Sequence, residues 1–120
     1  MSKAIKGTAV DFALSEDQKK LFITITGYLD SDNSPLLGAK IMKELKKTPR
    51  LGDIICNMSG ITYLSSTGIA MFMNFHVYTE EHKARLYLLS IPRKIRDVFT
   101  QLGFESYFTI INSLTDVSTY

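Results

Sequence analysis

Three consecutive hydroxyl residues, Ser65, Ser66 and Thr67, stand directly before Gly68 and a long apolar stretch. A hydroxyl at a helix start can accept a hydrogen bond from a first-turn N–H group, and one such residue is enough for capping. A phosphate on another would add about 1.5 to 2 negative charges beside the positive end of the helix dipole. The fold could then persist while the surface potential changed. The cluster indicates either an N-cap alone or a phosphorylation switch.

The residues that could support catalysis or metal binding are few and poorly placed. Cys56, the single cysteine, lies in an apolar run where a thiol is usually an inert core residue. His76 and His82 are six positions apart, a spacing that puts them on different faces of a helix. The chain has no Gly-x-Ser-x-Gly elbow and no phosphate-binding loop ending in Gly-Lys-Ser/Thr. We therefore expect no enzymatic activity, no metal ion and no cofactor.

Among the acidic residues, Asp30 has two readings. Glu80 and Glu81 have the neighbours of a solvated helix end. Asp30 instead follows a predicted strand and, together with Asp32, could form turn hydrogen bonds with nearby backbone. If that strand is parallel to the next one, Asp30 also lies at the sheet edge where residues 63–68 emerge. It would then place an acidic group near the hydroxyl cluster.

The first half of the chain predicts a β-hairpin followed by a helix. Alternating apolar residues favour strands over Thr8–Leu14 and 21–26, joined by a polar turn as an antiparallel pair. Turn-forming residues over 27–33 end the second strand. Ser34 as N-cap and Pro35 in the first turn then begin a helix that ends near Thr48.

The second half alternates strands and helices. A short apolar strand covers 53–58, and residues 61–64 either extend it or form its loop. The helix beginning at 65–68 has an apolar stripe with helical spacing, and Met71, Phe75 and Tyr78 lie off it, which suggests a second apolar face for a partner. The predicted order then continues with a strand at 85–90 and a helix from Pro92 to Gly103. It ends with a short strand at 109–111 and a last turn from Ser113.

These elements predict an α/β fold in one domain spanning residues 1–120. The sheet is mixed and four- to five-stranded, with an N-terminal antiparallel hairpin and three to four helices. A net charge of +2 is too small to indicate a protein that binds the phosphate backbone of nucleic acids. The lone cysteine fits a reducing compartment, and no apolar run has the length of a signal peptide or a membrane span, so we expect a cytoplasmic protein.

Four segments in this order carry a family resemblance: ITGYLD at 25–30, IICNMSGITYLSSTGIAMF at 54–72, LYLLSIPRKIRDVFTQLGF at 86–104 and FTIINSLTDV at 108–117. Together they resemble a STAS domain of the bacterial anti-sigma factor antagonist type. The resemblance implies that the unphosphorylated protein binds an anti-sigma factor, often a serine kinase, and so frees a sigma factor. Phosphorylation by that kinase ends the binding, and a serine phosphatase restores it.

The family motif implies which residues take part. The phosphorylated serine corresponds to Ser66, with Ser65 as second choice, and Ser65 stands where the family commonly has Asp. Together with the apolar helix that follows the motif, we expect one docking face with these partner-binding residues: Asp30, Tyr63, Leu64, Ser65, Ser66, Thr67, Gly68, Met71 and Phe75.

Two other readings remain open. In one, the domain is a constitutive scaffold, or a subunit of a lipid-transport or stressosome assembly, without phosphoregulation. In the other it is a small hydrolase with Ser66 as nucleophile and Asp30 or His76 as helper, although the sequence offers no positioned base.

Overall fold

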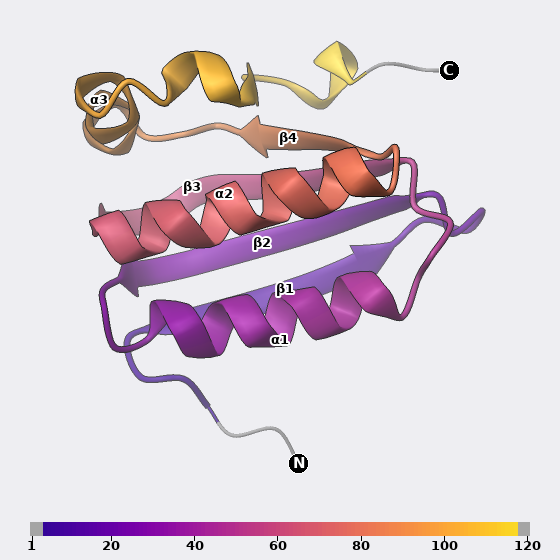
Figure 1. Cartoon of the computed structure of the whole chain (residues 1–120), viewed down its shortest axis with the longest axis horizontal. Coiled ribbons are helices and arrows are strands. Elements are labelled where there is room, and N and C mark those ends of the chain that lie inside the picture. The colour runs from indigo at the N-terminus through magenta and orange to yellow at the C-terminus, as the bar shows by residue number, and fades with distance from the viewer. Residues whose placement is uncertain (1–3, 118–120) are drawn as a thin grey trace.

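The computed structural model describes residues 4–117 and contains one five-stranded mixed sheet, in the order β1-β2-β3-β4-β5 (Figure 1). The strands are β1 (Thr8–Leu14), β2 (Lys20–Leu29), β3 (Asp53–Leu64), β4 (Arg85–Leu89) and β5 (Thr109–Ile111). The helices are α1 (Ser34–Lys46), α2 (Ser66–Glu81) and α3 (Arg93–Gln101), with 3-10 turns at Glu105–Tyr107 and Leu114–Asp116. β1 and β2 are antiparallel and all other neighbours are parallel, which confirms the predicted hairpin and fold class.

All three helices pack on one face of the sheet. Each parallel crossover advances in the same direction along the sheet, so right-handed connections place α1, α2 and α3 on the same side. One apolar cluster joins their buried residues to the inward side chains of the strands, among them Ile23, Ile41, Phe72 and Phe99. A smaller cluster of Ile55, Tyr87, Ile111 and Val117 lies apart from it.

Strand β2 is longer than the sequence pattern indicates. Residues 27–29 were predicted to belong to a turn, but they pair with the end of β3, Leu29 opposite Leu64. Gly27 allows β2 to continue through this position, because it has a φ of +96° and a Cβ there would lie 2.1 Å from the Gly7 carbonyl oxygen. Residues 61–64 extend β3 rather than forming a loop.

The helix boundaries agree closely with the prediction, with one correction at the start of α1. Asn33, not Ser34, is the N-cap residue, and Ser34 is a buried first-turn residue whose hydroxyl has no hydrogen-bond partner among residues 4–117. The helix ends at Lys46, slightly before the predicted Thr48. Gly103 follows α3 with a φ of +77°, as expected for a glycine after a helix.

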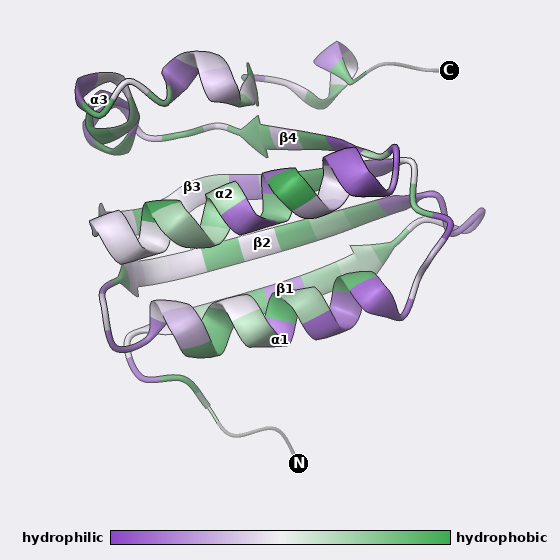
Figure 2. Cartoon of the chain, viewed as in Figure 1, coloured by the Kyte–Doolittle hydropathy of each residue, from purple (hydrophilic) through white to green (hydrophobic). Residues whose placement is uncertain are grey.

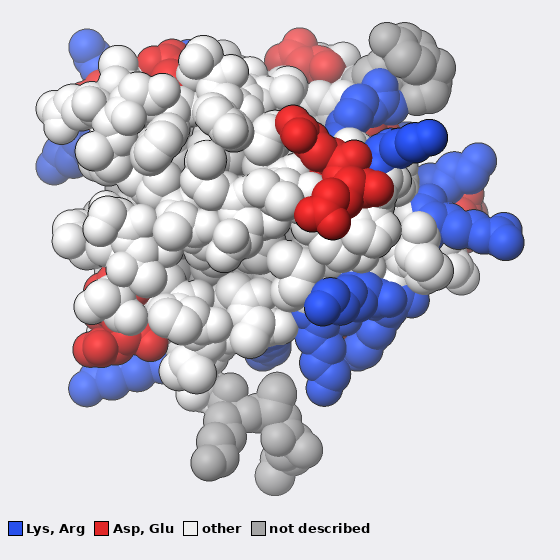
Figure 3. Space-filling model, viewed as in Figure 1, with Lys and Arg blue, Asp and Glu red and all other residues white. Residues whose placement is uncertain are grey.

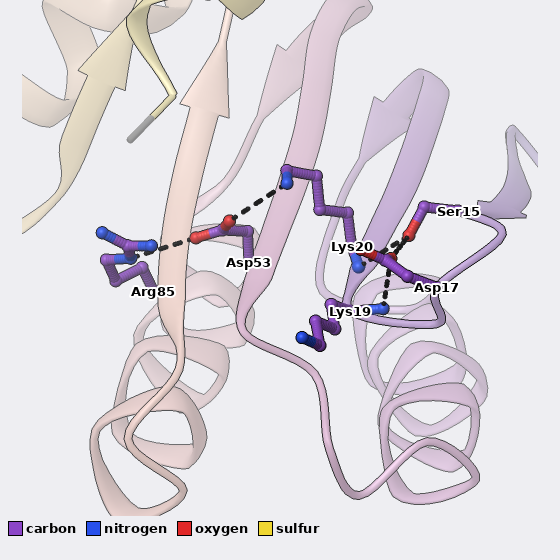
Figure 4. A network of polar contacts seen from close by, with 6 residues as sticks. All are labelled: Ser15, Asp17, Lys19, Lys20, Asp53 and Arg85. Carbon is purple, nitrogen blue, oxygen red and sulfur yellow. Dashed lines mark hydrogen bonds and ion pairs between the residues drawn. The ribbon is translucent and has the colours of Figure 1, made fainter. Parts of the chain in front are cut away.

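A buried carboxylate joins the first residues of three strands. Asp53 lies opposite Lys20 on one side and Arg85 on the other, with N–O distances of 4.0 and 3.0 Å (Figure 4). Next to it, the turn before β2 is held by Asp17, whose carboxylate accepts hydrogen bonds from the Ser15 hydroxyl and the Lys19 N–H. This network lies at the N-terminal ends of the parallel strands, and the hydroxyl cluster lies at the opposite ends.

Within residues 4–117, no helix combines the length and the apolar character that a bilayer crossing would need.

Candidate functional site

The ends of β2 and β3 bring Asp30 and the hydroxyl cluster to the same edge of the sheet. Leu29 pairs with Leu64, and the next residue, Ser65, donates its backbone N–H to the Leu29 carbonyl at 2.8 Å. Asp30 and residues 63–68 therefore emerge at one edge of the sheet, as the sequence predicts. Their proximity follows from the parallel register of the two strands.

Ser65 is the N-cap of α2. Its backbone is extended, with φ −83° and ψ 170°, and its hydroxyl oxygen accepts a hydrogen bond from the Gly68 N–H at 3.1 Å. The side chain is half-buried. The capping role predicted for this cluster thus belongs to Ser65, which leaves its oxygen less available for other chemistry.

Ser66 has a different environment, although it is the next residue. It is the first helical residue of α2 and is exposed, and its hydroxyl has no hydrogen-bond partner among the described residues 4–117. Its position in the first helical turn also places it beside backbone N–H groups that have no intrahelical acceptor. Of the two serines, Ser66 presents the accessible hydroxyl.

Gly68 allows α2 to begin directly against the strand ends. It is buried, and a Cβ at this position would lie 2.6 Å from Leu64 Cδ1 and 3.1 Å from Leu29 Cβ. Any larger residue must push the helix start away from β2 and β3. Gly68 and the buried Leu64 therefore pack beneath the surface at the start of α2, and they are not available to contact a partner.

Asp30 makes the turn hydrogen bonds that were one of its two predicted roles. Its Oδ1 accepts from the N–H groups of Asp32 at 2.9 Å and Asn33 at 2.8 Å. Asn33 returns the interaction, since its Oδ1 accepts from the Asp30 N–H at 2.9 Å and its amide donates to the carbonyls of Lys6 and Tyr28. The sequence reasoning missed Asn33. The Asp-x-x-Asn spacing before the helix is the signal that could have identified it.

Thr67 lies at one end of a hollow of about 350 Å³ between α1 and α2. Small residues, Gly38 and Ala70, line it, and it adjoins a second hollow through the shared residues Met42 and Asn74. The groove between the helices therefore begins beside the hydroxyl cluster and continues toward their C-terminal ends.

The surface around Ser66 is largely uncharged. Figure 3 shows few charged side chains over the N-terminal halves of α1 and α2, whereas acidic and basic side chains gather over their C-terminal ends. Figure 2 shows that the middle of α2 is largely apolar, with hydrophilic residues toward its C-terminal end. Leu36 (60% exposed) and Tyr63 (55% exposed) are large side chains at this end of the domain. An uncharged surface with exposed apolar groups is typical of a protein-binding face.

Two residues predicted for this face belong to the core instead. Met71 and Phe75 are only 5% and 1% exposed, so the second apolar face of α2 is not open to a partner at these positions. The cause is α1, which packs along that flank of α2 so closely that a Cβ on Gly38 would lie 3.1 Å from Met71. Tyr78 is half-buried against the same core.

The groups considered for catalysis are not assembled into a site. Burial raises the pKa of the Cys56 thiol to about 12, so the nucleophilic thiolate is not formed near neutral pH. His76 pairs with Glu80 at 2.8 Å and packs against the rings of Tyr107 and Phe108. In the part of the chain that the structure describes, no three His, Cys, Asp or Glu side chains are grouped so as to hold a metal ion.

Comparison with known proteins gives one family match and several solved structures. The STAS domain family matches residues 11–117. No curated protein matches the chain.

The similar structures share the fold at low sequence identity. The unphosphorylated anti-sigma factor antagonist SpoIIAA is 20% identical with a TM-score of 0.72, and the match covers 88% of this chain and 90% of SpoIIAA. The phosphorylated form of the Bacillus protein has a TM-score of 0.65 at 20% identity, covering 88% and 93% of the two chains. An anti-sigma factor antagonist from Mycobacterium paratuberculosis is 14% identical with a TM-score of 0.77, covering 96% and 94%.

Proposed function

The chain belongs to the STAS domain family, and from this premise we propose that it is an anti-sigma factor antagonist controlled by phosphorylation of Ser66. In the unphosphorylated state it binds an anti-sigma factor that is also a serine kinase, and the sigma factor held by that kinase is released. The kinase transfers phosphate to Ser66 and binding ends. A serine phosphatase restores the binding form.

The observation that carries this proposal is the contrast between Ser65 and Ser66. The Ser65 hydroxyl is engaged in capping α2, whereas the Ser66 hydroxyl is exposed and unpartnered among residues 4–117. A kinase needs such a free hydroxyl. The solved forms of SpoIIAA, which is similar in fold, include one that is unphosphorylated and one that is phosphorylated.

The surroundings of Ser66 suit a switch based on charge. A phosphate would bring about 1.5 to 2 negative charges to the largely uncharged surface around it. At the N-terminus of α2 these charges are tolerated by the helix dipole, so the fold is retained. Against an apolar or acidic partner the same charges must be desolvated, and a loss of about 3 kcal/mol would lower the affinity more than a hundredfold.

Ser65 caps α2 at the position where the family motif commonly has an aspartate. A serine oxygen caps the helix as an aspartate oxygen does, but it adds no negative charge beside Ser66. In this chain the residue directly before Ser66 therefore carries no charge, and the nearby acidic group at the end of β2 is Asp30. A phosphate on Ser66 would introduce a negative charge into the first turn of α2, which has no acidic residue of its own.

The test compares partner capture by the wild-type chain with capture by three variants. Wild type and Ser66→Ala should retain an anti-sigma factor kinase from a lysate of the source bacterium, and Ser66→Glu should lose it. Ser106→Glu, the same charge change at an exposed serine in the 3-10 turn after α3, is the matched control and should bind like wild type. Circular dichroism checks that each variant is folded.

The captured kinase is then incubated with ATP and each chain. Mass spectrometry should find phosphate on Ser66 in wild type and in Ser106→Glu, and none in Ser66→Ala. Equal binding of the Ser66→Glu variant, with no phosphate on either serine, would favour a constitutive scaffold or an assembly subunit. Hydrolytic turnover that disappears in Ser66→Ala would favour the hydrolase reading, which lacks support from the positions of Asp30 and His76.

A further inference from the structure

Among residues 4–117, the outer edge of β1 is an unpaired hydrogen-bonding edge. There β1 pairs with β2 alone, and two hydrogen bonds fix which backbone groups face inward: Tyr28 N–H to Gly7 O and Ser15 N–H to Lys20 O, both at 2.9 Å. In an antiparallel pair such residues alternate. The odd-numbered residues from 7 to 15 therefore direct their backbone groups toward β2, and the even-numbered ones direct them away.

Three residues consequently offer free donors and acceptors at this edge. The N–H and C=O groups of Val10, Phe12 and Leu14 have no hydrogen-bond partner within residues 4–117, while the N–H of Thr8 donates to the Ile5 carbonyl. Their side chains are apolar, and Leu14 is 43% exposed. The strand contains no lysine, proline or bulge, three of the features that protect an edge from pairing, and Asp11 is its one charged residue.

We propose that two copies of the chain associate through antiparallel pairing of their β1 strands, with Phe12 opposite Phe12 of the second copy. This register also places Val10 opposite Leu14, so all three free residues exchange hydrogen bonds with the second copy. It covers the exposed Leu14 side chain with Val10. The sheets of the two copies then form one continuous sheet.

Charge selects this register over the one centred on Asp11. Shifting the centre to Asp11 would set Asp11 directly opposite Asp11 of the second copy, and like charges in that position destabilise a sheet. With Phe12 at the centre, Asp11 lies opposite Ala13 instead. The acidic turn at Glu16 and Asp17 then runs alongside the segment that contains Lys6 of the second copy, an interaction between opposite charges.

The association is expected to be weak and independent of the proposed function. The paired surface is small, below about 1,200 Å², which corresponds to a concentration-dependent dimer. Ser66 lies at the ends of β2 and β3, away from this edge, and remains accessible in the dimer.

Sedimentation velocity of the full chain between about 10 µM and 1 mM should show a monomer–dimer equilibrium. Leu14→Lys should raise the midpoint concentration about tenfold, because it places a charge in the paired edge. Val77→Lys is the matched control, since Val77 is 49% exposed on α2, and it should behave like wild type. A monomer at every concentration, or weakening only by Val77→Lys, would overturn the proposal.

Disulfide trapping tests the register. In the proposed dimer, Asp11 and Ala13 of the two copies form non-hydrogen-bonded pairs, which have Cα atoms close enough for a disulfide. Mixing Asp11→Cys with Ala13→Cys under mild oxidation should give a crosslinked dimer, and neither variant should do so alone. Crosslinking of Asp11→Cys by itself would show the rejected register. The native Cys56 is buried and does not interfere.

Discussion

Replacing Ser65 by alanine should destabilise the domain, and the same replacement at Ser66 should not. Ser65→Ala removes the oxygen that accepts the Gly68 N–H at 3.1 Å. Loss of an N-cap costs about 1 kcal/mol, and the cost rises toward about 2 kcal/mol when the donor left behind is buried. Gly68 is buried, so we expect a loss of about 1 to 2 kcal/mol.

At Ser66 the alanine variant removes an exposed hydroxyl without a partner among residues 4–117. Surface substitutions of this kind change stability by less than about 0.5 kcal/mol. A third variant, Ser65→Asp, keeps an oxygen for capping and adds a negative charge at the positive end of α2, worth about 0.3 to 1 kcal/mol. It should be at least as stable as wild type.

Thermal and urea unfolding followed by circular dichroism would measure these differences. For a domain of this size, 1 kcal/mol corresponds to a shift of roughly 3 to 6 °C in the melting temperature. A Ser66→Ala variant that melts as low as Ser65→Ala would contradict this prediction, because the two hydroxyls would then share the structural role. A Ser65→Asp variant as unstable as Ser65→Ala would also contradict it, since a carboxylate oxygen should cap the helix equally well.

Three further predictions concern the supports of the site and the core. Gly68→Ala should cost about 1 to 3 kcal/mol by overpacking, whereas Gly52→Ala, where the nearest atom is 3.7 Å from the new Cβ, should be nearly neutral in the same urea titration. Asp53→Asn should lower the free energy of unfolding, measured in urea, by about 1 to 2 kcal/mol. This loss is smaller than for a fully buried ion pair, because the basic partners of Asp53 are partly exposed. Lys20→Met should lower the free energy of unfolding by less than Asp53→Asn does. The Cys56 thiol should react with iodoacetamide at pH 8 only after unfolding, because burial raises its pKa to about 12; rapid labelling of the folded chain would contradict this.

Some features of the site could be predicted because they are local. The start of α2 at residues 65–68 follows from hydroxyl residues before an apolar stretch, and the position of Asp30 beside it follows from the predicted parallel strands. The length of β2 could not be predicted in the same way. In the sequence, Gly27 looks like a turn residue. In the structure it lies within β2, where its φ of +96° and its missing side chain let the backbone at Gly7 pack against it.

The burial of Met71 and Phe75 depended on a neighbour that the sequence pattern does not reveal. α2 is apolar on nearly all sides, so its periodicity cannot show which sides are covered. The sheet covers one side, and α1, which approaches closely at Gly38, covers the flank that contains Met71.

Short segments of the chain are enough to predict the order of the elements, the mixed sheet and the hydroxyl cluster at a helix start, because periodicity, caps and turns are local properties. The difference between the two serines depends instead on the tertiary structure. The hydrogen bond from the Ser65 N–H to Leu29 holds Ser65 in the extended conformation that turns its oxygen toward Gly68. Ser66, one residue later, begins the helix with its side chain exposed. That difference comes from the pairing of two strands far apart in the chain, which no local pattern contains.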